Sequence, residues 1–120
     1  GSGWTTALLA QIVGPKGSVV GTERVPELVT FGSKNLGTYA FPNAHIEQAG
    51  RELGKPEAGP FNHILVSAAA EEVPEALKQQ LADGGRMVIP VENAICVVDR
   101  VGGHFKTVRH EGYVFVPLIT

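Results

Sequence analysis

The chain has 120 residues, which is enough for one domain with a real core and too few for two. Ten Lys plus Arg against twelve Asp plus Glu give a formal net charge of -2, and no basic block indicates a nucleic-acid partner. No apolar run is long enough to cross a membrane, and the single cysteine, Cys96, excludes an internal disulfide and is typical of a reducing cytoplasm.

The first half of the chain alternates between helix-forming and strand-forming patterns. Gly14 and Pro15 are breakers that end the first helix, and Pro26 is typical of the first turn of a second helix. Gly32, a poor helix former, falls inside that second helix. We expect a helix over 4–13, a strand over 18–22, a helix over 26–35, a strand over 45–47 and at most a short helix within 48–60.

The middle of the chain predicts a βαβ unit. The run 64–66 is too short for a helix and too apolar for a strand with one wet face, so it indicates a strand covered on both faces. A helix is expected over 74–81, ended by the glycines of 83–85, and a second buried strand over 86–91. Ligands of parallel sheets bind beyond the carboxyl ends of the strands, so the small-residue loop 67–70 lies on the expected functional edge.

The last part of the chain favours antiparallel strands. Strand-like runs at 94–100 and 104–109 flank Val101-Gly102-Gly103, which is typical of a hairpin turn, and a final strand is expected over 113–119. Alternating strands and helices followed by an antiparallel pair indicate an α/β fold, a doubly wound sheet with an antiparallel edge. We interpret residues 1–120 as one domain.

Two chemical signals lie in the first 23 residues. Gly1-Ser2-Gly3 opens the first helix, where a glycine turn lets the backbone approach a cofactor and the helix offers unpaired N–H groups. The same residues are the usual remnant of a cleaved tag, and without an initiator Met the chain is processed, tagged or a fragment. Glu23 ends the next strand, about 20 residues on, where a carboxylate can accept hydrogen bonds from both hydroxyls of an adenosine ribose. The alternative is a solvated glutamate beside Arg24.

Three segments carry a resemblance to a known family: GSGWTTALLAQIVGPKGSVVGTERVPELV, ILVSAAAEEVPEALKQQLADGGRMVIPV and GYVFVPLI. Together, from Gly1 to Ile119, they resemble protein-L-isoaspartate O-methyltransferases, which use S-adenosylmethionine to methylate the stray carboxylate of isoaspartyl residues in damaged proteins. The resemblance implies a Rossmann-like methyltransferase sheet, truncated before or at its first strand, and a protein-repair transferase of the cytoplasm. It also implies S-adenosylmethionine as cofactor and an isoaspartyl-containing protein or peptide as partner.

The resemblance also implies roles for particular residues. Gly1 and Gly3 would lie beside the methionine part of the cofactor, Glu23 would hold the ribose, and the loop 67–70 would border the place where methyl donor and carboxylate meet. The segment 116–118 resembles the family's terminal strand near the substrate, though it is equally good core. The implied cofactor-binding residues are Gly1, Ser2, Gly3, Glu23, Arg24, Ala49 and Gly50, and the implied substrate-binding residues are Ser67, Ala68, Ala69 and Val116.

No catalytic residue is assigned, because a sulfonium donor is already activated and a carboxylate is already a nucleophile. Catalysis would consist mostly of aligning the methyl carbon with the attacking oxygen and excluding water.

Two substitutions depart from the family pattern. Gln48-Ala49-Gly50 stands where the family usually has Gly-Asp-Gly, whose aspartate reaches the adenine amino group. Ala49 cannot make that bond, and its loss is expected to weaken affinity by roughly tenfold to a hundredfold, from about 1.5 to 3 kcal/mol. Phe61-Asn62 replaces an aromatic-aspartate pair, which changes a hydrogen bond at a strand start.

The family's hydrophobic first strand, and the amino-terminal region that supplies part of the substrate pocket, would precede Gly1. About five buried aliphatic side chains make such a strand worth on the order of 10 kcal/mol, against about 5 to 15 kcal/mol for a whole domain. We therefore expect one of three arrangements: the strand at 18–22 pairs directly with that at 64–66, another chain fills the gap by exchange in a homo-oligomer, or the chain is a piece of a longer protein.

Alternative functions have less support in the sequence. A non-catalytic remnant of the same fold is one, and a nicotinamide-dependent oxidoreductase is another, although Trp4-Thr5-Thr6 does not complete the G-x-G-x-x-G motif. Glu71 and Glu72 are either paired acids near the functional edge or residues that favour the start of the following helix. Cys96 is expected to be a buried hydrophobe, and no metal-ligand spacing joins it to His45, His63, His104 and His110.

Overall fold

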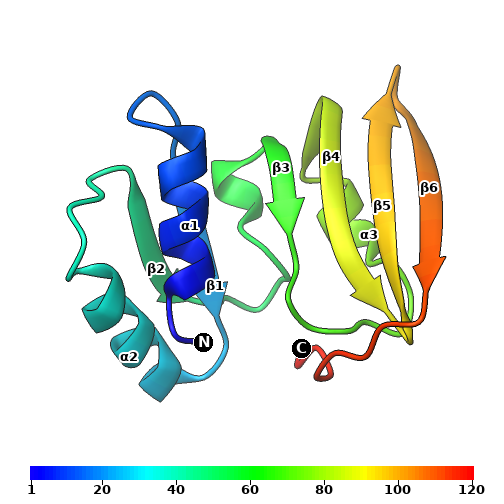
Figure 1. The fold of residues 1–120 in the computed structure, drawn as a ribbon. Helices are drawn as coiled ribbons and strands as arrows, with labels where there is room; N and C mark the ends of the chain where they lie inside the picture. Colours follow the sequence, from blue (N-terminus) through cyan, green and yellow to red (C-terminus); the bar gives the residue numbers. More distant parts are fainter. The chain divides into compact units, whose positions relative to one another are not determined.

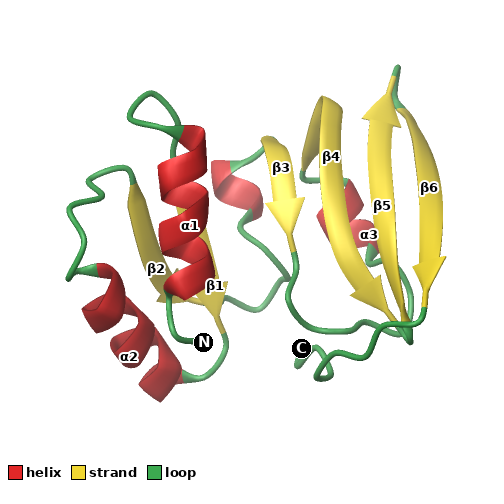
Figure 2. Cartoon of the chain, viewed as in Figure 1, coloured by secondary structure: helices red, strands yellow, loops and turns green.

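The computed structural model describes all residues, Gly1–Thr120, and divides them into two compact units. The amino-terminal unit covers Gly1–Gly50 and the carboxyl-terminal unit covers Arg51–Thr120. Both combine helices with parallel strands, as Figures 1 and 2 show, so the predicted α/β class is confirmed. None of the helices has the length and apolar character that a membrane crossing requires.

The amino-terminal unit contains the four elements that the sequence predicts. They are α1 (Trp4–Val13), β1 (Val19–Glu23), α2 (Pro26–Leu36) and β2 (Ala44–Gln48). β1 and β2 pair in parallel along their whole length. Pro26 opens α2, because the first turn of a helix does not need its missing N–H.

This unit has a small core and relies on close backbone approach. Its buried apolar side chains are Ala7, Ala10 and Leu36. A Cβ atom added to Gly21 would lie 2.9 Å from the Thr6 hydroxyl oxygen, so β1 passes directly beneath α1. At the far end of α1, the Asn43 side-chain amide donates to the Gly14 carbonyl at 2.9 Å and to the Gly17 carbonyl at 3.3 Å. These bonds hold the turn that follows the helix.

The carboxyl-terminal unit is built on a mixed four-stranded sheet in the order β3-β4-β5-β6. β3 and β4 are parallel and the other two pairs are antiparallel, which confirms the βαβ unit, the hairpin and the antiparallel edge. The prediction that the strand at 64–66 is covered on both faces is wrong, because β3 is the first strand of the sheet and Leu65 is exposed. β6 is the last strand of the sheet, and nearly all of its residues are exposed. The elements are η1 (Pro56–Ala58), β3 (Phe61–Leu65), α3 (Glu75–Lys78), β4 (Leu81–Val91), β5 (Ala94–Val101) and β6 (His104–Glu111).

The core of the carboxyl-terminal unit lies on the face of the sheet that α3 covers. Met87 and Ile89 of β4 and Val98 of β5 are completely buried there. Cys96 is free and buried among them, as the sequence predicts. The whole cluster consists of Leu77, Leu81, Met87, Ile89, Val91, Cys96 and Val98.

The predicted helix over 74–81 is wrong at its carboxyl end. α3 has only four residues, because the buried Gln80 side chain donates to the Leu53 carbonyl at 2.8 Å and accepts from the Lys55 N–H at 2.9 Å. The chain then enters β4 at Leu81. The glycines of 83–85 do not end a helix; they form an irregularity in the pairing of β4 with β3.

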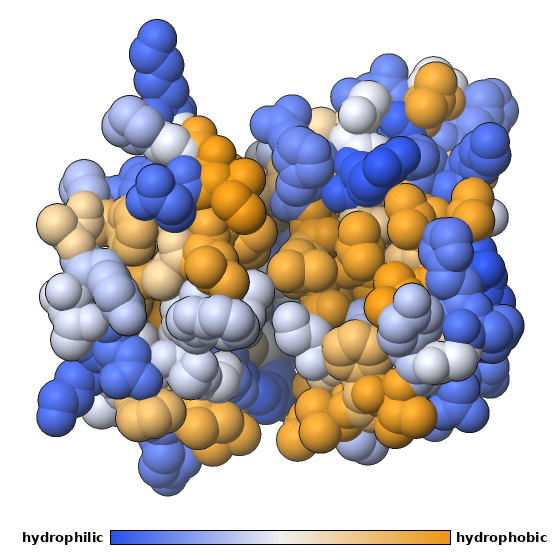
Figure 3. Space-filling view, in the orientation of Figure 1, coloured by the Kyte–Doolittle hydropathy of each residue, from blue (hydrophilic) through white to orange (hydrophobic).

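The predicted strand over 113–119 is also wrong. Only one isolated bridge occurs there, between Pro117 and Ala69. Several large apolar side chains of this carboxyl-terminal segment are exposed, and Figure 3 shows apolar surface around it.

The strands fall into two separate sheets. β1 pairs only with β2, and β3 belongs to the four-stranded sheet. Direct pairing of the strand at 18–22 with that at 64–66 would join the two units, and it stays a prediction.

Candidate functional site

The glycine loop, Gly1-Ser2-Gly3, leads directly into α1. Gly3 is the N-cap residue with a left-handed φ of 83°, and its carbonyl accepts the Ala7 N–H at 3.0 Å in the first turn. A Cβ atom on Gly3 would collide with the Gly32 carbonyl oxygen of α2. The loop therefore requires glycine at this position for two reasons, the backbone conformation and the contact with α2.

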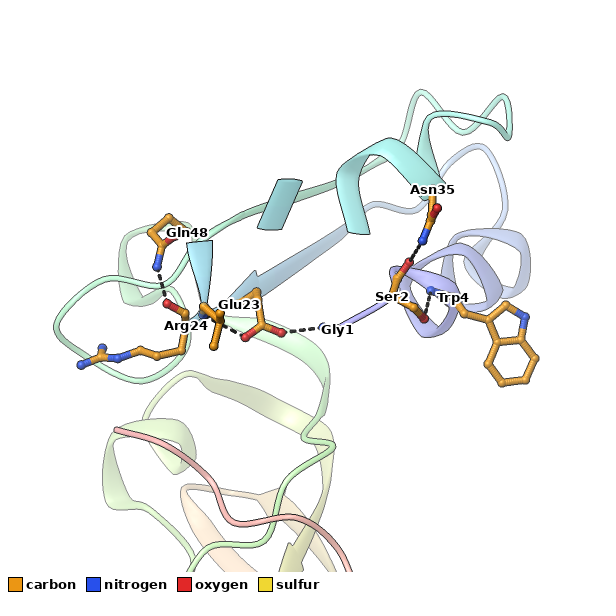
Figure 4. Close-up of polar contacts among 8 residues, drawn as sticks. Gly1, Ser2, Trp4, Glu23, Arg24, Asn35 and Gln48 are labelled. Atoms are coloured by element: carbon orange, nitrogen blue, oxygen red, sulfur yellow. Dashed lines mark hydrogen bonds and ion pairs between the residues drawn. The ribbon is translucent and has the colours of Figure 1, made fainter. Parts of the chain in front are cut away.

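Glu23 places a carboxylate beside this loop. Its Oε2 atom lies 2.5 Å from the Gly1 amino group, and its Oε1 atom accepts the Val25 N–H at 3.1 Å (Figure 4). Burial by itself would raise the pKa of Glu23. Hydrogen bonds from the Gly1 amino group and from the backbone of Val25 and Arg24 outweigh burial, so the pKa is lowered from 4.5. Glu23 is thus an ionised acid at neutral pH.

The ends of β1 and β2 are joined to each other. The Ala49 N–H donates to the Glu23 carbonyl at 2.8 Å, and the Arg24 guanidinium donates to the Gly50 carbonyl at 3.0 Å. The Gln48 side chain donates to the Arg24 carbonyl at 2.6 Å, as Figure 4 shows. Because parallel strands end at one edge, these contacts bring Glu23, Arg24, Ala49 and Gly50 together beside the glycine loop. Ala49 contributes only a methyl group there.

α2 supplies two residues that the sequence analysis did not assign to the site. Gly32 contacts the glycine loop, and the Asn35 side-chain amide donates to the Ser2 carbonyl at 2.9 Å. An isolated glycine inside a predicted helix often marks a close backbone approach, which was the available signal for Gly32. No comparable signal existed for Asn35, because its partner lies 33 positions away.

A cavity of about 190 Å³ lies beside the glycine loop. It is smaller than the roughly 300 to 1,000 Å³ of ordinary small-molecule sites, and its lining does not include Glu23 or Arg24, so it is separate from the residues at the ends of β1 and β2. Its lining residues are Ser2, Gly3, Trp4, Asn35, Thr38 and Tyr39.

The small-residue loop after β3 is fixed on two sides within the carboxyl-terminal unit. The Ala69 N–H donates to the Val116 carbonyl at 2.7 Å, and the Leu118 N–H donates to the Ala69 carbonyl at 2.8 Å. The Ala70 N–H donates to the Pro90 carbonyl of β4 at 3.0 Å. Ser67 is exposed, and Val116 is 69% exposed, so Val116 is not part of the core.

The predicted residues thus fall into two groups, one in each unit. All seven predicted cofactor-binding residues lie in the amino-terminal unit, and all four predicted substrate-binding residues lie in the carboxyl-terminal unit.

The remaining candidate residues have less support. α3 begins at Glu75, and Glu75 is the acid of its first turn. Glu71 and Glu72 both precede its N-cap, Pro74, and a role for either acid stays a prediction. No group of three or more His, Cys, Asp or Glu side chains is arranged to hold a metal ion.

Comparison with known proteins connects this arrangement to one family. The family model described as Protein-L-isoaspartate(D-aspartate) O-methyltransferase (PCMT) matches residues 1–120. The protein-L-isoaspartate O-methyltransferase of Pyrococcus horikoshii is 41% identical over 125 residues, which cover 99% of this chain and 56% of that protein. The enzyme of the same name from Methanothrix thermoacetophila is 40% identical and is covered to 58% of its length. The chain therefore spans a little over half the length of these relatives.

Solved structures show the same fold. A protein-L-isoaspartate O-methyltransferase superposes on the whole chain with a TM-score of 0.90 at 23% identity, over 40% of its own length. A putative protein-L-isoaspartate O-methyltransferase from Plasmodium falciparum, solved in complex with S-adenosyl-L-homocysteine, gives a TM-score of 0.75 at 29% identity and covers 85% of this chain. The family match over every residue, the relatives and the fold agree: the chain belongs to the protein-L-isoaspartate(D-aspartate) O-methyltransferase family.

Proposed function

We propose that the chain provides the cofactor-binding part of an S-adenosylmethionine-dependent protein carboxyl methyltransferase that acts on isoaspartyl residues. The observation that carries this proposal is the ionised Glu23 carboxylate, held beside the glycine loop at the carboxyl end of β1. The family relationship and the complex of the Plasmodium falciparum protein with S-adenosyl-L-homocysteine support the same cofactor.

The residues at this edge fit a nucleoside cofactor in part. Glu23 can accept hydrogen bonds from the two ribose hydroxyls, since each carboxylate oxygen has more than one lone pair. Gly1, Ser2 and Gly3 present backbone without bulky side chains, and Arg24 and Gly50 border the same edge. Ala49 offers no acceptor for the adenine amino group, so we expect weaker binding than an aspartate would give there.

The bound cofactor would supply an activated methyl group, and the chain's residues would position the acceptor. We propose that Ser67, Ala68, Ala69 and Val116 contact the isoaspartyl peptide. Small side chains leave room for an approaching carboxylate, and hydrogen bonds between Ala69 and the carboxyl-terminal segment fix the loop. Because the carboxylate attacks without losing a proton, no general base is needed, and alignment and exclusion of water provide the catalysis.

We further propose that the two units act as one domain in the cytoplasm, where the free, buried Cys96 would stay reduced. Exchange of a strand between chains remains the proposal for self-association. A sizing column tests it, because exchange predicts a dimer.

The experiment for the cofactor is a calorimetric titration of the chain with S-adenosylhomocysteine. We expect heat of binding from the unmodified chain and little from Glu23→Ala. Glu27→Ala, which removes an exposed acid from the first turn of α2, serves as the control and should bind like the unmodified chain. Equal binding by Glu23→Ala would remove Glu23 from the site, and absence of heat from the unmodified chain would overturn the proposal.

A further inference from the structure

We propose that Asn35 is a positioning residue that holds the glycine loop in the orientation that binds cofactor. The inference rests on the proposed function and adds to it a residue of α2, distant in the sequence, that sets the direction of a backbone donor. Asn35 itself is not proposed to touch the cofactor.

The glycine loop has little of its own to fix it. Gly1 and Ser2 are exposed, and α1 has no side-chain cap at its amino end. The local contact from the Trp4 N–H to the Ser2 hydroxyl is 3.4 Å long, beyond the ordinary range for such a bond. Glu23 of β1 contacts Gly1, and another element must hold Ser2 and Gly3.

α2 is that element, and it acts through two residues on one side of the helix. A Cβ atom on Gly32 would lie 2.8 Å from the Gly1 carbonyl oxygen and 3.3 Å from the Gly3 nitrogen, so the helix backbone supports the loop directly. Asn35 follows three positions later, on the same face, and donates to the Ser2 carbonyl at 2.9 Å (Figure 4). The Gly32 contact sets the distance between the glycine loop and α2. The Asn35 hydrogen bond sets the orientation of the loop.

The orientation matters because the peptide group between Ser2 and Gly3 is planar and trans. When Asn35 draws the Ser2 carbonyl toward α2, the Gly3 N–H of the same peptide group must point away from α2. This N–H donates no hydrogen bond within the chain. Asn35 therefore directs a free donor outward, toward the side on which a cofactor would approach.

Asn35 is well placed for this task. It is half-buried, and the next residue, Leu36, is buried in the unit's small core. The Thr38 hydroxyl donates to the Asn35 carbonyl at 2.7 Å, which fixes the end of α2. A positioning side chain is effective only when its own backbone is held in this way.

The first measurement needs no cofactor. Nitrogen-15 relaxation of the Gly3 amide is compared in the unmodified chain, in Asn35→Ala and in Ser33→Ala, which alters an exposed residue of the same helix. We expect the heteronuclear Overhauser effect of Gly3 to fall in Asn35→Ala only, while the amides of β1 and β2 stay unchanged. Asn35→Asp, similar in size but without the donor, should act like Asn35→Ala and replaces it where the alanine variant does not fold.

The second measurement is a titration of the same variants with S-adenosylhomocysteine. We expect Asn35→Ala to raise Kd by roughly three- to tenfold, the effect of one hydrogen bond, and Ser33→Ala to leave Kd unchanged. An unchanged heteronuclear Overhauser effect of Gly3 in Asn35→Ala and Asn35→Asp would overturn the inference. A lower Overhauser effect with an unchanged Kd would overturn it too. If the unmodified chain binds no cofactor, the proposed function fails, and the relaxation data still decide whether Asn35 holds the loop.

Discussion

The two units hold a small-residue loop at the end of parallel strands in different ways. In the carboxyl-terminal unit the loop at Ser67–Ala70 adjoins a core of seven buried residues, Leu77, Leu81, Met87, Ile89, Val91, Cys96 and Val98. In the amino-terminal unit the glycine loop rests on backbone contacts with α2, and the buried apolar side chains are only Ala7, Ala10 and Leu36. Stability follows buried apolar area, so the larger core should carry more of the free energy of unfolding.

Because of this difference, the two units should respond to different kinds of mutation. Loss of apolar volume should affect the carboxyl-terminal unit most, and loss of glycine or of a polar contact should affect the amino-terminal unit most. Trp4, the single tryptophan, lies in the amino-terminal unit, so its fluorescence can follow that unit separately.

The largest effect is expected for Ile89→Ala in the carboxyl-terminal core. Ile89 is completely buried, and truncation of such a side chain lowers the free energy of unfolding by about 2 to 5 kcal/mol. Urea unfolding followed by far-UV circular dichroism measures the change. Ile119→Ala makes the same chemical change at a residue that is 63% exposed, and it should have an effect below about 0.5 kcal/mol. Equal effects of the two variants would contradict the assignment of the core.

Gly3→Ala should have the next largest effect. The variant adds the strain of a left-handed alanine, about 1 to 2 kcal/mol, to a collision with Gly32 worth about 1 to 3 kcal/mol. Gly84→Ala is the matched control, because Gly84 also has a left-handed φ but has open space around it. This variant should show the strain of a left-handed alanine without a collision. Urea unfolding measures the loss of stability in each variant. Trp4 fluorescence follows unfolding of Gly3→Ala, and circular dichroism follows unfolding of Gly84→Ala. A smaller loss for Gly3→Ala than for Gly84→Ala would show that the contact with α2 is unimportant.

Acid should weaken the amino-terminal unit through Glu23. Burial raises the pKa of this side chain, but the hydrogen bonds from the Gly1 amino group and the nearby backbone lower it below 4.5. A group whose pKa is lowered by folding stabilises the protein above its unfolded pKa, and this contribution is lost as the pH falls below 4.5. Glu23→Gln should lower stability at pH 7 by about 1.5 to 3 kcal/mol. The variant should also lose less stability than the unmodified chain as the pH falls. Urea unfolding followed by Trp4 fluorescence at a series of pH values measures this. Glu27→Gln should keep the pH dependence of the unmodified chain.

The smallest effect is expected for Asn43→Ala, which removes the bonds to the Gly14 and Gly17 carbonyls. Loss of a side-chain hydrogen bond costs about 0.5 to 1.5 kcal/mol. Gln11→Ala changes an exposed amide side chain of α1 in the same unit and serves as the control. Thermal unfolding followed by Trp4 fluorescence should separate the two variants, and identical midpoints would argue against a role for Asn43 in ending α1.

The sequence predicted the start of α2 and the hairpin between β5 and β6, where Pro and Gly mark the ends of elements, but the glycines of 83–85 lie within β4 and end no helix. Pro26 opens α2 and the glycines at 102 and 103 form the hairpin turn, because these residues act through their own backbone conformation. The errors in the predicted elements arose where contacts with residues distant in the sequence determine the conformation. Gln80 ends α3 through contacts with Leu53 and Lys55, and the apolar segment 113–119 forms only one bridge, to Ala69.

The site divides in the same way. Glu23 was predictable from its position at a strand end after a glycine turn, and the structure places it beside that turn. Asn35 was not predictable, because its hydrogen bond to Ser2 depends on how α2 packs and not on any local pattern. The proposed roles of the site residues in binding the methyl donor and the peptide stay predictions.

The composition of β6 bears on self-association. An outermost strand offers unsatisfied N–H and C=O groups to any neighbour, and proteins commonly guard such strands with charge. Five of the eight residues of β6 are ionisable, His104, Lys106, Arg109, His110 and Glu111, and Arg109 pairs with both Glu111 and Glu92. Pairing of another chain along this strand would remove part of the water around these charged side chains. Any docking of one copy on another should therefore avoid β6.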